Sequence, residues 1–175
     1  MNTKVHEHSL LLILCVCAET EFLGFDYIQQ WVEEVSNDIP VLPHWLIDLA
    51  MCIDSSEISS TLHKKMFEDG IADGVAYTEL SIGFLSWKYE RKEISFSELE
   101  HHLIDMADGS FYLDIDIEAC SEAFARGPCM LDSDTDVALL LRRCCSLAKR
   151  QFEYFSSKEI LKNEQNLFEP PALCF

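Results

Sequence analysis

Glycine and proline are scarce in this chain of 175 residues, with 6 and 5 copies respectively. This scarcity excludes a collagen-like chain and argues against a linker or a turn-rich all-β protein. Apolar residues nevertheless make up 49% of the sequence, which excludes a wholly disordered protein. The length suffices for one domain with a substantial hydrophobic core and is short for two. We therefore expect a single domain over residues 1–175.

Basic residues are also scarce, with 13 Lys and Arg against 31 Asp and Glu and a net charge of −18. No Lys or Arg lies between Lys4 and Lys64, although that stretch carries ten acidic residues. Nucleic acid and anionic membranes are bound through Lys and Arg that replace counterions. We therefore expect neither as a direct partner, whereas a basic protein partner is compatible with this charge.

Long apolar runs are absent, since Leu10–Ala18 covers only about half of a membrane span. A secretory signal places a basic segment before its apolar stretch. Here the preceding residues include one Lys and one Glu, Lys4 and Glu7. We interpret the run as a buried helix rather than as a signal peptide.

Cysteines, in contrast, are numerous, with eight in the chain. A disulfide framework is typical of short secreted scaffolds that cannot build a core. This chain can build a core, and most of its cysteines lie within apolar helical patterns, where a free thiol acts as a small hydrophobic group. The adjacent pair Cys144 and Cys145 is poorly placed for a mutual bridge. We expect free thiols and a cytoplasmic location.

The spacing of apolar residues predicts helices along nearly the whole chain. We expect Ser9 to cap the first helix, and Ser95 and Glu98 to form a capping box before a helix that ends at Gly109. Residues 111–117 alternate apolar and acidic side chains, and we favour an extended lead-in there over a strand. The first helix is predicted over residues 9–21. Further helices are predicted over residues 25–36, 44–53, 59–67, 74–91, 117–125 and 135–155.

These patterns together predict an all-α fold of about seven or eight helices. The segment 44–53 is apolar on most sides, so we expect its helix to be central. Residues 156–175 are expected to form a C-terminal tail, with Pro170 and Pro171 leading to a loose end.

The acidic triplet Asp132, Asp134 and Asp136 resembles the start of a calcium-binding loop. Such a loop needs glycine at position six and a bidentate glutamate at position twelve, which here are Val137 and Arg143. The calcium interpretation therefore fails. The positive end of the helix dipole favours acidic residues at a helix start, so we interpret the triplet as helix capping.

Metal ligation and catalysis find little support in the sequence. His6 and His8 could join Cys15 and Cys17 in a zinc site, but a flexible terminus is a poor place for one. We interpret the histidines as ordinary surface residues and expect no metal and no cofactor. The sequence has no Gly-x-Ser-x-Gly elbow and no phosphate-binding glycine loop, and buried thiols are unreactive. We therefore expect a non-catalytic protein.

The acidic residues form two blocks. Those over 19–57 are interleaved with helical core positions and are typical of a solvated helix face. Those over 105–136 lie partly in connecting segments, where binding residues concentrate, so we predict that this block binds the partner. It consists of Asp105, Asp108, Asp114, Asp116, Glu118, Glu122, Asp132, Asp134 and Asp136.

The stretch from Trp87 to Asp108, with the pattern W-x6-I-S-x-S-E-L followed by L-x3-A-D, resembles a helix-turn-helix of helical bacterial immunity proteins. Small size and acidity extend the resemblance. It implies a protein that neutralises a cognate toxin domain, often a basic nuclease, such as those of contact-dependent growth inhibition. The alternative is a helical adaptor or regulatory subunit whose acidity only keeps it in solution.

Overall fold

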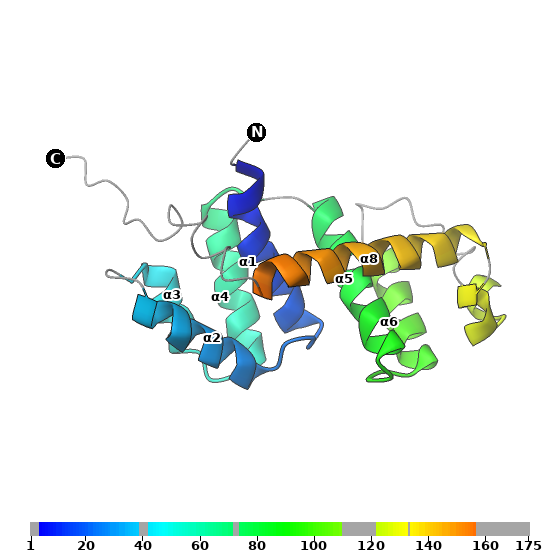
Figure 1. The fold of residues 1–175 in the computed structure, drawn as a ribbon, viewed down its shortest axis with the longest axis horizontal. Coiled ribbons are helices and arrows are strands. Elements are labelled where there is room, and N and C mark those ends of the chain that lie inside the picture. Colours follow the sequence, from blue (N-terminus) through cyan, green and yellow to red (C-terminus); the bar gives the residue numbers. More distant parts are fainter. Residues whose placement is uncertain (1–3, 39–41, 72–73, 110–121, 133, 157–175) are drawn as a thin grey trace. The chain divides into compact units, whose positions relative to one another are not determined.

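A computed structural model describes the chain except for residues 1–3, 39–41, 72–73, 110–121, 133 and 157–175. Every regular element in the described ranges is helical, which confirms the predicted all-α fold (Figure 1). None of these helices is both long enough and apolar enough to cross a membrane. The elements are α1 (Lys4–Glu19), α2 (Phe25–Asp38), α3 (His44–Ala50), α4 (Ser55–Glu68), α5 (Gly74–Glu90), α6 (Phe96–Gly109), the 3-10 helix η1 (Pro128–Asp132) and α8 (Asp136–Ser156).

The chain divides into two compact units. Unit 1 consists of Met1–Ala72 and Gln151–Phe175, and unit 2 consists of Asp73–Arg150. Helix α8 therefore contributes its first fifteen residues to unit 2 and its last six to unit 1. Whether the two units behave as one domain, as the chain length suggests, stays a prediction. The expected tail lies almost entirely outside the described residues.

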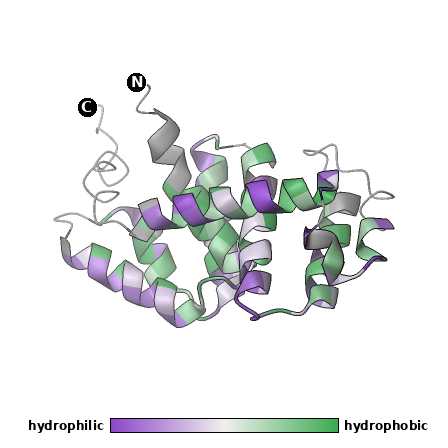
Figure 2. Cartoon of the chain, turned by 45° about the vertical axis from the view of Figure 1, so that its right-hand side comes forward, coloured by the Kyte–Doolittle hydropathy of each residue, from purple (hydrophilic) through white to green (hydrophobic). Residues whose placement is uncertain are grey.

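The core of unit 1 is built around α1. All nine residues from Leu10 to Ala18 are buried, which confirms that the apolar run is a core helix. Helix α4 packs against α1, α3 against α4, and α2 against α3 (Figure 1). The buried residues of α4 are Ile58, Leu62 and Met66, spaced so that one face of the helix meets the core. Figure 2 shows hydrophilic and hydrophobic residues mixed along α2 and α8, as expected where a helix covers a core with one side.

Two predictions about unit 1 are wrong. Helix α1 begins at Lys4, so Ser9 lies inside the helix and does not cap it. The segment 44–53 is not central, because α3 ends at Ala50 and the side chains of Ile47 and Ile53 are exposed. Hydrophobicity alone could not distinguish a helix that is buried all round from one that leaves apolar side chains in solvent.

Helix α4 starts four residues earlier than predicted because Asp54 caps it. The carboxylate of Asp54 accepts a hydrogen bond from the Glu57 N–H at 2.9 Å, and Glu57 accepts one from the Ile53 N–H at 2.8 Å. These bonds satisfy two backbone N–H groups at the start of the helix. The predicted start at Ser59 is therefore corrected to Ser55.

The core of unit 2 forms between α5, α6, the short segment at 123–124 and α8. Its buried residues include Ile82, Leu85, Leu99, Leu103, Phe124 and Leu141. Helix α5 lies close to α8 at Gly83, where an added Cβ would overlap the backbone oxygen of Cys144 and lie 2.8 Å from the Cβ of Ala148. Only glycine permits this approach of the two backbones.

The capping box before α6 is confirmed. The Glu98 N–H donates to the Ser95 hydroxyl at 3.2 Å, and the Ser95 N–H donates to the Glu98 carboxylate at 2.7 Å. Helix α6 then runs to Gly109 as predicted. The alternating segment 111–117 and most of the predicted helix 117–125 lie outside the described residues, although residues 122–124 are helical.

Candidate functional site

The structure describes the side chains of five of the nine predicted partner-binding acids. All five are exposed: Asp105 on α6, Glu122 after the break in the described chain, Asp132 at the end of η1, Asp134 before α8, and Asp136 at its first position. Asp108 lies in α6 but its side chain is outside the description. Asp114, Asp116 and Glu118 lie outside the described residues altogether.

Three of these acids, Asp132, Asp134 and Asp136, form what we call the acidic segment, where the chain turns into α8. The predicted capping role needs correction, because the hydroxyl of Thr135 accepts the hydrogen bond from the Ala138 N–H at 3.3 Å. Asp136 lies in the first turn, where the helix dipole favours an acid. The acidic segment therefore stands at the helix start without supplying its side-chain cap.

Asp134 also lies close to one base. A carboxylate oxygen of Asp134 is 3.6 Å from a guanidinium nitrogen of Arg142, one to two turns along α8, and the Asp134 side chain is 99% exposed. Exposed ion pairs of this kind contribute little, typically about 0–1 kcal/mol. The carboxylate can therefore exchange Arg142 for a cation of a partner at small cost.

A cleft of about 490 Å³ lies beside the acidic segment within unit 2. Helices α5, α6, η1 and α8 all contribute to its wall, and Asp132 and Arg142 join it to the acidic segment. The hydroxyl of Ser86, on α5, is buried and has no hydrogen-bond partner among the described residues. The remaining lining residues are Tyr89, Glu90, Leu99, Pro128, Cys129, Leu141 and Cys145.

The two thiols of the cleft differ in environment. Cys129 is exposed, whereas Cys145 is buried. Burial, with a smaller contribution from the nearby Glu90, raises the pKa of Cys145 to about 11, although Lys149 opposes part of the rise. The thiol of Cys145 is therefore protonated at neutral pH and is a poor nucleophile. Within the described residues, Cys15, Cys17, Cys52 and Cys144 are likewise free and buried.

Two bases of α8 are engaged by acids of α5. Arg143 pairs with Glu79 at 2.6 Å, and Lys149 pairs with Glu90. The sequence shows a cluster of bases at 142–150 but not its partners, because Glu79 and Arg143 are 64 residues apart. The cleft itself was also missed, since its wall comes from four elements with no shared motif.

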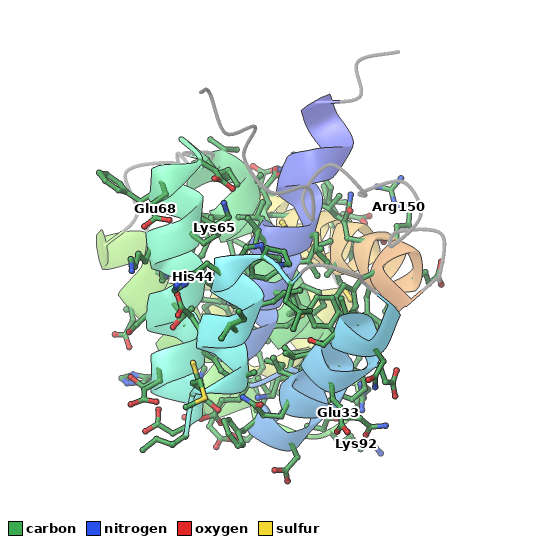
Figure 3. All side chains as sticks on the ribbon, turned by 90° about the vertical axis from the view of Figure 1, so that its left-hand side faces the viewer. Glu33, His44, Lys65, Glu68, Lys92 and Arg150 are labelled. Atoms are coloured by element: carbon green, nitrogen blue, oxygen red, sulfur yellow. The ribbon has the colours of Figure 1, made fainter. Side chains whose placement is uncertain are left out.

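The acids of the first block lie where a solvated helix face would put them. Glu33 and Glu34 are exposed on α2, whose buried side carries Ile28, Val32 and Val35 (Figure 3). The amide of Gln30 donates to Glu34 at 3.0 Å.

No protein-family model, no curated protein and no solved structure matches this chain. The resemblance to immunity proteins therefore stays a prediction.

Proposed function

We propose that this chain is a non-catalytic binding protein that neutralises a basic partner domain through unit 2, as an immunity protein does with a toxin. The observation that carries the proposal is the exposed acidic segment beside the cleft. Three carboxylates within five residues face solvent there, and the only base within ion-pairing distance among the described residues is the exposed Arg142. The proposal places the protein in the cytoplasm, where such a toxin would act.

The electrostatics support a partner with a cationic surface. A net charge of −18 attracts a basic domain over a distance of about one Debye length, roughly 8–10 Å at physiological salt. Such attraction raises the association rate and disfavours acidic partners. A nuclease is the class of toxin that fits best, because its substrate cleft must itself be basic to hold nucleic acid.

The cleft suits the side chain of a lysine or arginine from the partner. Tyr89, Leu99 and Leu141 offer apolar contact for the methylene stem, and Asp132, an exposed acid in the same wall, is available for the charged head. The buried hydroxyl of Ser86 can accept a further hydrogen bond. A lysine or arginine side chain of the partner would lose water in this cleft and gain apolar, ionic and hydrogen-bonding contacts in its place.

Charge reversal tests the proposal. The proposal predicts a toxin gene directly upstream of the gene for this chain. The toxin domain that this gene encodes is the probe. We expect Asp132→Lys/Asp134→Lys to abolish protection of cells that produce this domain. The association rate of the purified proteins should fall by about tenfold or more at low salt.

The matched control is Glu33→Lys/Glu34→Lys, which makes the same change in charge on the exposed face of α2. We expect it to retain protection. Loss of protection with this control and full protection with the acidic-segment variant would place the binding face on unit 1. Full protection by both would remove the electrostatic basis of the proposal.

A second candidate function, a helical adaptor, is favoured by apolar side chains at the end of α3. The side chains of Ile47, Met51 and Ile53 are 44%, 75% and 77% exposed. These three apolar residues lie within seven positions of one another in the sequence. An adaptor that docks through this surface should lose its partner in Met51→Gln/Ile53→Gln. The acidic-segment variant should then bind normally, which separates the two functions.

A further inference from the structure

Three side chains of metal-ligating type converge in unit 1. Cys15 and Glu19 lie one turn apart on α1, and His63 lies on α4, the helix that packs against α1. The Sγ of Cys15, a carboxylate oxygen of Glu19 and a ring nitrogen of His63 all lie within 4.8 Å of one another. The Glu19 Oε1 and the His63 Nε2 are 2.6 Å apart. Two helices thus bring sulfur, oxygen and nitrogen donors to one point.

This convergence follows from how the two helices pack. Residues at positions i and i+4 share a helix face, which places Glu19 over Cys15. On α4, the buried Leu62 seats the helix on the core and so brings the next residue, His63, to the edge of the contact. The Cys15 side chain is fully buried, whereas the side chains of Glu19 and His63 are 31% and 49% exposed. The cluster therefore has a closed inner wall and an open outer side.

The geometry suits a tetrahedral metal centre. Zinc bonds of about 2.3 Å to sulfur and 2.0–2.2 Å to nitrogen and oxygen place neighbouring ligand atoms about 3.4–3.6 Å apart. The contact between Glu19 and His63 must then widen by about 1 Å, which rotation of two partly exposed side chains permits. Three protein ligands leave the fourth position to water on the exposed side.

The donor set also selects the class of metal. Calcium and magnesium take oxygen ligands, whereas a thiolate together with an imidazole favours zinc and related transition metals. We infer that Cys15, Glu19 and His63 form a binding site for a zinc-class divalent cation, with water as the fourth ligand. Binding of the cation releases the thiol proton of Cys15 to solvent, and the His63 ring binds the cation through the lone pair of one nitrogen.

The site is independent of the proposed partner surface, because it lies in unit 1 and uses none of the acidic segment. It joins α1 to α4 through ligands that are far apart in the unfolded chain. A metal that binds only the folded form stabilises that form. The bound cation would therefore strengthen the packing around the core helix of unit 1.

Cobalt(II) titration of the reduced full-length protein tests the inference, because cobalt occupies zinc sites and is coloured. We expect one equivalent of cobalt to produce a thiolate-to-cobalt charge-transfer band in the near ultraviolet and the strong visible bands of a tetrahedral centre. One equivalent of zinc should bleach both. Absence of a charge-transfer band from the wild-type protein would overturn the inference.

Variants with matched controls identify the ligands. His63→Gln should weaken cobalt binding by about 100-fold or more, since even outer-shell changes cost about 10–100-fold. His44→Gln, at the exposed first position of α3, should leave it unchanged (Figure 3). Cys15→Ala should abolish the charge-transfer band, whereas Cys17→Ala in the same helix should keep it.

The exposed ligands keep the test decisive if Cys15→Ala fails to fold. In that case Glu19→Gln and His63→Gln, both at partly exposed side chains, must each lower cobalt affinity. Unchanged affinity in both variants, or a charge-transfer band that survives in Cys15→Ala, would show that other cysteines bind the metal and would overturn the assignment.

Discussion

Among the described residues, helices α1 and α5 carry the longest runs of buried residues in their units, and they achieve burial in different ways. In α1, nine consecutive residues from Leu10 to Ala18 are buried, and all are apolar. In α5, the seven buried residues from Leu80 to Ser86 include two serines and Gly83. Unit 1 fills its centre with large side chains, whereas unit 2 brings two helix backbones together over a glycine. The two cores should therefore respond to opposite changes in volume.

The largest expected effect is the loss of volume in unit 1. Leu14 is fully buried, so Leu14→Ala should lower the free energy of unfolding by about 2–5 kcal/mol through lost burial and the cavity that remains. Urea unfolding measures this change, with Trp31 and Trp45 as fluorescent probes in unit 1. Leu139→Ala, at a half-exposed position of α8, is the control and should change stability by less than about 1 kcal/mol. Equal effects of the two substitutions would show that α1 is not closely packed.

The next effect is the gain of volume in unit 2. Gly83→Ala should destabilise by about 1–3 kcal/mol, because the new methyl group meets the Cys144 carbonyl, a backbone atom that cannot rotate away. This loss should exceed the gain in helix propensity, which is about 1 kcal/mol. Trp87 fluorescence during urea unfolding reports on unit 2.

Gly24→Ala is the control for this comparison. An added Cβ at Gly24 meets nothing within 4 Å, and Gly24 precedes α2 at its N-cap, so the variant should lose less than about 1 kcal/mol. If Gly83→Ala were equally harmless, the close approach of α5 and α8 would be disproved.

A smaller effect compares the side-chain caps of α4 and α6. Asp54→Ala in unit 1 and Ser95→Ala in unit 2 each remove the acceptor for an N–H at a helix start. Each should cost about 0.5–2 kcal/mol. Ser60→Ala and Ser97→Ala, exposed within α4 and α6, should cost nothing, since alanine is the better helix former. A cost at these controls as large as at the caps would contradict the capping role.

The smallest effect depends on pH. The hydrogen bond from the Ser95 N–H lowers the pKa of Glu98, so its ionised form is favoured in the folded state. A carboxylate with a lowered pKa stabilises the fold above its unfolded pKa of about 4.3, and this contribution disappears as the pH falls through its folded pKa. The stability difference between wild type and Glu98→Gln should therefore shrink as the pH is lowered from 7 to 3. A constant difference would show that Glu98 does not act through its charge.

Local signals in the sequence were sufficient to predict the elements. The scarcity of glycine and proline, the helical spacing of apolar residues and the capping box at Ser95 predicted the all-α fold and the bounds of α2, α5 and α6 closely. The errors occurred where local signals were weak or competed. Ser9 resembles a cap but lies inside a helix, and Asp54 is the cap that was overlooked.

The candidate site likewise has features that the sequence predicted and features that it did not. The distribution of acidic residues along the sequence marked the block over 105–136. Its five described side chains are exposed, and its role in binding stays a prediction. The cleft of unit 2 and the cluster of Cys15, Glu19 and His63 were not predicted. Their residues are brought together from separate helices, and Glu19 and His63 are 44 residues apart.

Neighbouring residues and simple composition were enough to predict the helical class, the excess of negative charge and the burial of Leu10–Ala18. The tertiary structure decided which surfaces exist. The packing of the helices pairs two bases of α8 with acids of α5 and places α5 against α8 at Gly83. It also brings His63 close to Cys15 and Glu19. The physical reason is that side chains far apart in the chain meet only after helices pack, and the packing depends on shape that local patterns do not encode.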